Sequence, residues 1–251
     1  MDTGRCVTFS AVFNFRDLGG YEAADGRSVR SGLVYRADGL HRLTGADVDR
    51  FAGLRVRRVI DLRRADEVGT YGRVPEVPGL TYHNVCLQTT AWTATDVRPG
   101  AMAEYLAARY GEIADEAVGG AMGTVLRLIA DDTPGGTVFH CMAGKDRTGV
   151  VAAVLLALLD VPDETIAADY ALSQAAEEQY FAWRASQRPD APAPTGTGDA
   201  APAEAILTFL AGLRTRYGSV AGYAERAGAD RAVRAALRAR LLVDTEPAAA
   251  D

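Results

Sequence analysis

The chain has 251 residues, of which 48% are hydrophobic and 24% are charged. These proportions are typical of a globular protein and exclude collagen-like and wholly disordered chains. The 27 Lys and Arg residues are outnumbered by 33 Asp and Glu residues, which gives a net charge of −6. We therefore do not expect a nucleic-acid partner, because a phosphate backbone calls for a basic surface. The apolar run at residues 150–159 is shorter than the roughly 20 residues that span a bilayer, so stable membrane insertion is not expected either.

The cysteines and the single lysine narrow the interpretation. The cysteines are Cys6, Cys86 and Cys141, an odd number at wide spacing, and the start of the chain does not resemble a signal peptide. This pattern favours a reducing compartment and predicts a cytoplasmic protein. Lys145 is the only lysine, and the other cations are arginines.

The first half of the chain alternates between strand-like and helix-like segments. Residues 7–12 and 31–36 read as strands, with a turn at Gly19-Gly20 between them. Thr44 is expected to cap a helix that runs to Leu54. Strands are then predicted at residues 56–62 and 80–87. The arginines around the first of these two strands are interpreted as a solvated surface; they are Arg55, Arg57, Arg58, Arg63 and Arg64.

The second half is mostly helical. Residues 99–130 predict two helices that break near Gly119-Gly120, followed by a short strand at 137–140 and a strongly apolar helix at 148–159. Helices are also predicted at 165–188 and 203–242, joined by a flexible Pro/Ala-rich loop at 189–202. The alternation predicts an α/β fold, with a mainly parallel sheet flanked by helices. We expect one domain over 1–251, with a core at about 7–175 and a C-terminal helical cap at about 176–242.

The segment from His140 to Gly149 reads HCMAGKDRTG and connects the predicted strand to the apolar helix. Backbone N–H groups of residues 142–147 can curl around a tetrahedral anion there, and the helix dipole adds positive potential. The same nest stabilises the thiolate of Cys141. Arg147 supplies a planar fork for two phosphate oxygens, which lysine cannot reproduce. Thr148 can donate its hydroxyl toward the sulfur.

Other interpretations of this segment are weaker. A lone cysteine at the end of an apolar strand is most often a core residue, and only the spacing to Arg147 favours catalysis. A nucleotide-binding P-loop is excluded, because Asp146 follows the lysine and Phe139 stands where that motif needs glycine. A metal site of His83, Cys86, His140 and Cys141 is weak, because the chain has no paired CxxC motif.

The segment resembles the active-site loop of cysteine-dependent protein tyrosine phosphatases, in particular the bacterial atypical family that includes mycobacterial enzymes acting on phosphoproteins and phosphoinositides. Further landmarks of that family occur in the same order. They are NFRDLGG at 14–20, Arg30-Ser31-Gly32 with Tyr35-Arg36, Asp61-Leu62-Arg63 with Glu67, and residues 161–173 with Asp169-Tyr170. The resemblance covers roughly residues 10–180 and implies a protein tyrosine phosphatase-like fold.

The resemblance also implies roles in the loop. Cys141 is the nucleophile, Arg147 clamps the phosphate, and no metal or cofactor takes part. The phosphate cradle consists of Met142, Ala143, Gly144, Lys145, Asp146 and Arg147. The family is thought to carry its general acid inside this loop, which makes Asp146 the proton donor, although a structural role for this carboxylate stays open. Asp61 is expected to orient Arg147 or to replace Asp146 as the acid, while Asp96, Asp115 and Asp132 are weaker candidates.

Supporting roles remain for neighbouring residues. His140 is expected to hold the loop by hydrogen bonding. Arg16 and Asp17 either face the substrate or form an ion pair that buttresses the loop. Lys145 resembles the cation of lipid phosphatases, but it can equally serve the thiolate. The helices after the loop form a mobile lid in the family, although residues 189–202 are less apolar than a lid needs.

These residues predict a phosphomonoester hydrolase that forms a cysteinyl-phosphate. The expected substrate is phosphotyrosine in a phosphoprotein, or a phosphoinositide. One alternative keeps the chemistry but acts on a small phosphorylated molecule, such as a nucleotide or an intermediate of antibiotic biosynthesis. The other alternative is a phosphate-binding module without turnover.

Overall fold

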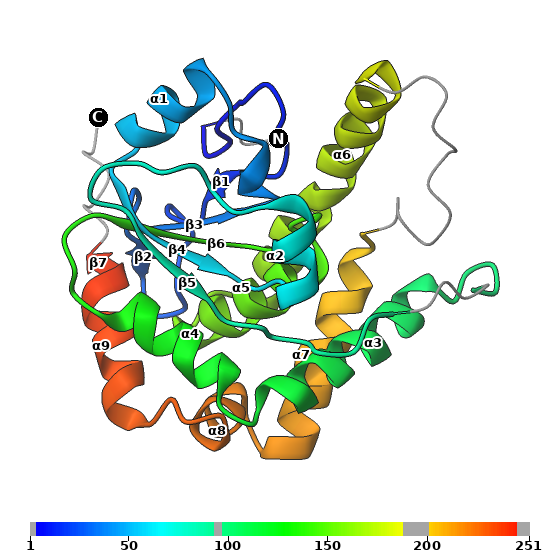
Figure 1. Cartoon of the computed structure of the whole chain (residues 1–251). Helices are drawn as coiled ribbons and strands as arrows, with labels where there is room; N and C mark the ends of the chain where they lie inside the picture. The colour runs from blue at the N-terminus through cyan, green and yellow to red at the C-terminus, as the bar shows by residue number, and fades with distance from the viewer. Residues whose placement is uncertain (1–3, 93–96, 188–200, 245–251) are drawn as a thin grey trace, which may run out of the picture.

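The computed structural model describes residues 4–92, 97–187 and 201–244. The loop predicted at 189–202 therefore lies outside the described residues as far as residue 200. A five-stranded sheet runs through the centre (Figure 1). In spatial order its strands are β1 (Arg16–Asp17), β3 (Val34–Ala37), β6 (Gly136–His140), β4 (Val56–Asp61) and β5 (Thr81–Asn84). β1 is antiparallel to β3 and the other pairs are parallel, as the sequence predicted.

Neighbouring side chains on each central strand enter opposite cores. Val138 of β6 packs in one cluster and Phe139 in the other, and Val59 and Ile60 of β4 divide in the same way. This alternation follows from the period of two along a strand. One face is covered by the N-terminal segment, the short 3-10 helix η1 (Leu40–Arg42) and α1 (Ala46–Gly53).

The opposite face carries the larger core, formed with most of the remaining helices (Figure 1). The helices after α1 are α2 (Ala65–Tyr71), α3 (Met102–Ala117), α4 (Ala121–Ala130), α5 (Asp146–Leu158), α6 (Asp163–Gln187), α7 (Ala203–Tyr217), α8 (Val220–Arg226) and α9 (Arg231–Leu241). The break between α3 and α4 confirms the prediction at Gly119-Gly120. α5 is apolar on all sides because the sheet and α3, α6, α7 and α8 surround it.

The last described strand pairs with a strand from the first 30 residues. β2 (Arg27–Val29) and β7 (Leu242–Asp244) form a separate two-stranded antiparallel sheet. Neither strand was predicted: residues after 203 were expected to be helical, and β2 was not identified. Both strands are three residues long, too short to show a periodic pattern.

Three local expectations were wrong. Residues 7–12 are irregular: pairing with the outer edge of β1 is limited to a bridge between Cys6 and Arg16, and Phe9 and Val12 are buried against the face that carries α1. The N-cap of α1 is Gly45, with φ 52°, instead of Thr44. Arg58 and Arg63 are buried and donate hydrogen bonds to the carboxylates of Asp131 and Asp61, respectively. The arginine cluster around β4 is therefore only partly a solvated surface.

Within the described ranges, none of the helices combines the length and the apolar character needed to cross a membrane.

Candidate active site

The loop from Cys141 to Lys145 lies where three parallel strands end. β3 ends at Ala37, β4 at Asp61 and β6 at His140, and these residues are register partners in adjacent strands. Loops that follow the carboxyl ends of parallel strands share one edge of the sheet, which is the usual ligand site of such folds. The register therefore brings the segments after residues 37, 61 and 140 together.

Three consecutive carbonyl groups of the loop are held by donors outside it. The carbonyl of Met142 accepts from the N–H of Gly39 at 2.9 Å. That of Ala143 accepts from Nδ2 of Asn14 at 3.0 Å, and that of Gly144 from Nη2 of Arg36 at 2.8 Å. A peptide group carries its N–H opposite its C=O. Fixing these carbonyls outward therefore directs the following N–H groups toward the inside of the loop, as an anion nest requires.

Gly144 is required by the path of the loop. Its φ is +70°, in the left-handed region that favours glycine. A Cβ at this position would lie 2.6 Å from the carbonyl oxygen of Ala37 and 2.7 Å from the N–H nitrogen of Asp38. The loop is therefore packed against the end of β3 more closely than any side chain permits.

Arg147 is held by a carboxylate from another element. Its Nη1 and Nη2 donate to the two oxygens of Glu67 in α2, at 2.6 and 2.9 Å. Burial disfavours the charged form of Arg147, but the hydrogen bonds of Glu67 and the charges of Cys141, Glu67 and Asp146 more than offset it and raise its pKa. The guanidinium is thus fixed in one plane beside the loop.

Asp61 takes a different part from the one expected. Its carboxylate accepts from Arg63 at 2.6 and 2.9 Å and from the hydroxyl of Tyr82 at 2.9 Å. Glu67 occupies the place beside Arg147 that we had expected for Asp61. Asp61 instead anchors the end of β4, because Arg63 lies only two residues further along the same turn.

Asp146 is the first residue of α5, so its side chain lies at the helix N-terminus. Its Oδ1 accepts from the hydroxyl of Tyr110 in α3 at 2.9 Å. Among the weaker acid candidates, Asp115 pairs with Arg216 and Asp132 with Arg240, while Asp96 lies outside the described residues.

Cys141 opens the loop and is 2% exposed. Thr148 lies one turn into α5, and its buried hydroxyl has no hydrogen-bond partner among the residues that the structure describes. Lys145 is also buried, and its Nζ donates to Oε2 of Glu177 in α6 at 3.0 Å. The single lysine therefore links the loop to α6.

His140 lies behind the loop. Its Nδ1 is 3.1 Å from the carbonyl of Cys141 and its Nε2 is 3.7 Å from Oδ2 of Asp61. Burial lowers the pKa of His140, although the nearby charge of Asp61 opposes this effect. The neutral form of the ring is therefore favoured. Since a carbonyl can only accept, Nδ1 carries the proton in this contact.

Arg16 and Asp17 have separate partners. Arg16 Nε donates to Oδ1 of Asp169 in α6 at 2.8 Å, and its Nη1 donates to Oδ1 of Asn14. Asp17 accepts from the N–H groups of Gly19 and Gly32 at 2.8 and 2.7 Å. The buttressing ion pair thus joins Arg16 to Asp169, whereas Asp17 closes a turn.

Two hollows beside the loop share Arg42, Met142 and Tyr180, with volumes of about 110 and 400 Å³. We call them the α6 groove; its further lining includes His41, Tyr71, Trp183 and Arg184. Arg42 lies over the ring of Tyr180 at 4.8 Å. This groove therefore offers aromatic and cationic side chains next to the phosphate loop.

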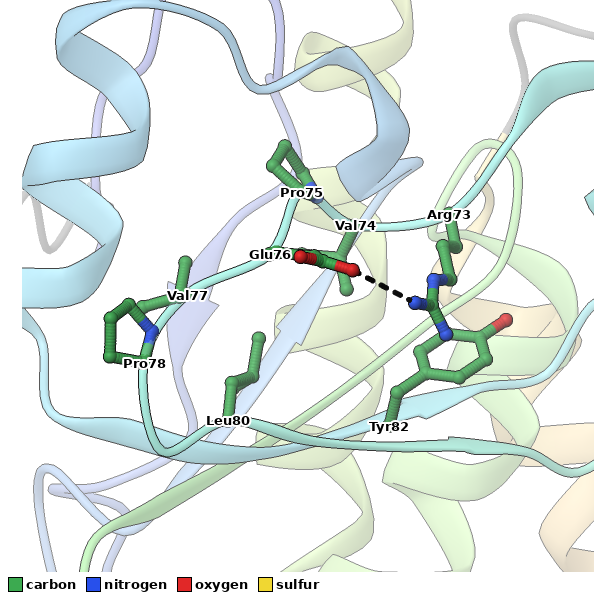
Figure 2. A pocket seen from close by; sticks show the side chains of 8 residues that line it. All are labelled: Arg73, Val74, Pro75, Glu76, Val77, Pro78, Leu80 and Tyr82. Atoms are coloured by element: carbon green, nitrogen blue, oxygen red, sulfur yellow. Dashed lines mark ion pairs between the residues drawn. The ribbon is translucent and has the colours of Figure 1, made fainter.

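A more open cavity of about 650 Å³ is lined mostly by the segment that connects α2 to β5 in the chain. Its lining residues are 73–78, Leu80 and Tyr82 (Figure 2). Figure 2 shows the ion pair of Arg73 and Glu76, at 3.6 Å, above the ring of Tyr82. None of the loop residues lines this cavity. Among the described residues, His, Cys, Asp and Glu side chains form no group of three or more that could hold a metal ion.

Most of the residues that hold the loop had no role assigned from the sequence. Asn14, Arg36 and Glu67 appeared only as family landmarks, although each contacts loop residues. Their motifs, NFRDLGG, YR and DLRxxxE, were the available signal. Gly39 donates through its backbone, and Tyr110 lies in an Ala-rich helix, so neither gave a signal.

Comparisons with known proteins find a matching family and several relatives. A family model described as "Tyrosine phosphatase family" matches residues 7–243. A protein named as a tyrosine-protein phosphatase of Cupriavidus necator is 31% identical over 189 residues, 69% of this chain and 65% of that protein. This chain therefore spans less than two thirds of that relative.

Two further relatives and one solved structure are also similar. A tyrosine-protein phosphatase of Nostoc commune is 29% identical, over 80% of this chain and 71% of that protein. A triple specificity protein phosphatase of Mycobacterium tuberculosis is 28% identical, over 63% of this chain and 66% of that protein. The crystal structure of P. aeruginosa TpbA aligns with a TM-score of 0.35 and 18% identity, over 83% of this chain and 96% of that one. On the match of the family model, this chain belongs to the tyrosine phosphatase family.

Proposed function

We propose that the protein hydrolyses phosphate monoesters through a cysteinyl-phosphate on Cys141. The observation that carries this proposal is the outward fixing of the carbonyls of Met142, Ala143 and Gly144, beside a guanidinium held in one plane. This arrangement concentrates N–H donors and one arginine around Cys141. A phosphoryl group in flight carries its charge on three oxygens, and preorganised donors stabilise that charge without reorganisation.

The reaction takes place in two balanced steps. The Cys141 thiolate attacks phosphorus, the S–P bond forms, the bond from phosphorus to the leaving oxygen breaks, and Asp146 gives its proton to that oxygen. Water then attacks phosphorus and gives a proton to the Asp146 carboxylate as the S–P bond breaks. The products are inorganic phosphate, the free alcohol or phenol, and the original thiolate. Thr148 assists the second break by donating to the sulfur its hydroxyl, which has no other partner within the described ranges.

For the substrate we propose phosphotyrosine. A phosphoinositide is the second substrate class to be compared in the experiment described below. The aromatic and cationic side chains of the α6 groove support an aromatic ester beside the loop. Two of the relatives are named as tyrosine-protein phosphatases, and the mycobacterial relative is named as a triple specificity protein phosphatase.

The nucleophile is tested by Cys141→Ser, which we expect to lower kcat on p-nitrophenyl phosphate by at least about 10³-fold. Cys86→Ser is the matched control, since Cys86 donates to the carbonyl of Gln88 instead. It should leave kcat unchanged, and so should EDTA. Turnover retained in Cys141→Ser, or lost on addition of EDTA, would contradict the mechanism.

The acid is tested by Asp146→Asn. This variant should lose kcat/KM by about 10²-fold or more on an alkyl phosphate, but much less on an aryl ester whose leaving group needs no proton. Equal losses on both substrates would assign Asp146 a structural role.

The substrate is tested by measuring phosphate release from a panel of phosphotyrosine and phosphoserine peptides, phosphoinositides and nucleotides. A phosphotyrosine peptide should give the highest kcat/KM. Preference for a nucleotide would support the small-molecule alternative, and tight phosphopeptide binding without release would support a binding module.

For the compartment we propose the cytoplasm. Cys6, Cys86 and Cys141 are all free thiols. A thiolate nucleophile also needs a reducing environment in order to stay active.

A further inference from the structure

Two buried tyrosines form a hydrogen-bonded chain that ends at the carboxylate of Asp146. The hydroxyl of Tyr110 in α3 donates to Oδ1 of Asp146 at 2.9 Å, and it lies 2.5 Å from the hydroxyl of Tyr170 in α6. The two tyrosines are 0% and 1% exposed. The function proposed above uses Asp146 but assigns no task to either tyrosine.

Hydrogen-bond chemistry sets the direction of this chain. A carboxylate can only accept, so the single proton of Tyr110 is given to Asp146. The contact between the two phenols must then be donated by Tyr170. Burial first, and then the charge of Asp146, raise the pKa of Tyr110 well above 10, and the same causes raise the pKa of Tyr170. Both phenols therefore stay protonated and act as donors at neutral pH.

The surrounding rings fix the pair in place. Trp92 stacks on Tyr110 with centroids 6.4 Å apart, and Phe209 of α7 meets it edge-on at 6.2 Å. The ring of Tyr170 lies 3.1 Å from the place where a Cβ on Gly149 of α5 would be, so this glycine admits the ring. Packing on three sides leaves the two hydroxyls little freedom to move away from Asp146.

On the basis of the proposed hydrolysis, we propose that Tyr110 is a positioning residue for the general acid and that Tyr170 orients Tyr110. Tyr110 occupies Oδ1 of Asp146. The catalytic proton therefore resides on Oδ2, and the carboxyl group is held in one rotamer while it protonates the leaving oxygen. The phenols do not touch the reacting atoms and act only through Asp146.

The test is Tyr110→Phe, which removes one hydroxyl and keeps the ring contacts. We expect kcat/KM to fall about tenfold on an alkyl phosphate and by less than about twofold on p-nitrophenyl phosphate, because only a poor leaving group needs the proton. The inhibition constant of inorganic phosphate should stay unchanged, since the cradle is intact. Tyr170→Phe should show the same selectivity with a smaller loss, and it provides a second variant if Tyr110→Phe does not fold.

Tyr223→Phe is the matched control. Tyr223 is also 0% exposed, and its hydroxyl donates at 3.1 Å to the carbonyl of Ala114 in the same helix, α3. This variant loses a buried phenol hydrogen bond to α3 without touching Asp146, so its kinetics should match those of the unmodified protein on both substrates. A uniform loss on both substrates in Tyr110→Phe would assign Tyr110 a purely structural role and overturn the proposal.

A double-mutant cycle separates this proposal from the proposed function. In the Asp146→Asn background, Tyr110→Phe should cost less than about twofold more on the alkyl phosphate, because no acid is left to position. A full additional tenfold loss would overturn the positioning role while leaving the acid role of Asp146 intact. Absence of leaving-group selectivity in Asp146→Asn alone would instead refute the acid role, and the positioning role with it.

Discussion

Arg147 is oriented by a residue 80 positions away in the chain, Glu67 of α2. Burial alone would raise the pKa of Glu67, but the hydrogen bonds and charge of Arg147 outweigh it and lower the pKa. The carboxylate is therefore ionised and accepts both N–H groups of the arginine. It fixes the plane of the guanidinium, which in the proposed function is the group that contacts the phosphate.

We expect Glu67→Gln to reduce kcat/KM by about 10²-fold, because an amide keeps only one acceptor oxygen and turns its NH₂ group toward the second guanidinium nitrogen, so that the clamp becomes misaligned. Asp66→Asn is the control on the adjacent residue, because Asp66 pairs with Arg64 and its side chain is 69% exposed. Steady-state kinetics on p-nitrophenyl phosphate would check both variants. Equal activities would mean that Arg147 finds its plane without Glu67.

Gly144 gives a second prediction at the residue scale. Gly144→Ala should destabilise the protein through both the left-handed backbone and a collision with the end of β3. Gly26→Ala is the control, since Gly26 has φ +83° but has no atom within 4 Å of its Cβ position. The control should lose about 1–2 kcal/mol from backbone strain alone. Urea unfolding of the two variants checks this, and equal losses would show that the loop moves aside freely.

The local part of the site was predictable from the sequence and the distant part was not. Cys141, Gly144 and Arg147 lie within seven residues, so the spacing itself constrains where they lie. The partner of Arg147 depends on how α2 packs beside the loop, which a short motif does not specify. For this reason Asp61 was expected where Glu67 is found.

At the scale of elements, α6 is joined to the sheet by one carboxylate. Asp169 accepts from Arg16 of β1 at 2.8 Å, from Arg36 of β3 at 2.6 Å and from the hydroxyl of Tyr21 at 2.9 Å. Arg36 in turn donates to the carbonyl of Gly144. Asp169 is thus the link between α6, two strands and the phosphate loop.

We expect Asp169→Asn to lower the free energy of unfolding by about 3–5 kcal/mol, because it leaves two buried arginines without their counter-charge. Asp163→Asn is the control in the same helix, since Asp163 pairs with Arg214 and the side chains are 28% and 43% exposed. Its cost should stay below about 1 kcal/mol. Chemical denaturation measures both, and similar losses would refute the central role of Asp169.

Element types were better predicted than element ends. The periodic segments at 99–130 and 148–159 became α3, α4 and α5, because long repeats determine a helix. Residues 7–12 have the composition of a strand, yet the pairing with β1 stops at Cys6, and Phe9 and Val12 pack into the core instead. Whether an apolar segment pairs with a strand or packs into a core depends on tertiary contacts, which composition does not record.

At the scale of the whole molecule, buried carboxylates paired with arginines hold both a local turn, at Asp61 and Arg63, and segments that are distant in the chain, at Asp169. Asp61 and Asp169 both have lowered pKa values, because their arginine partners outweigh the burial that opposes ionisation. A group whose pKa is lower in the folded state than in the unfolded state adds stability above its unfolded value. That stability is lost as the pH falls toward the folded value.

The stability should therefore decline below about pH 4, where an unfolded aspartate begins to take up protons. The difference in free energy of unfolding between the unmodified protein and Asp169→Asn should be constant from pH 7 to 5 and should shrink toward pH 3. Urea titrations at fixed ionic strength measure it. A difference that does not change with pH would mean that Asp169 is not ionised in the fold.

One stretch of α6 reaches three consecutive residues, namely the last two of the loop from Cys141 to Lys145 and the first residue of α5. Asp169 reaches Gly144 through Arg36, Glu177 pairs with Lys145, and Tyr170 reaches Asp146 through Tyr110. We expect the loop and this part of the helix to open as one cooperative unit. An anion bound in the loop should then slow hydrogen exchange of the α6 amides. The solvent protection of a helix that begins after α5 has ended would in this way report occupancy of the site.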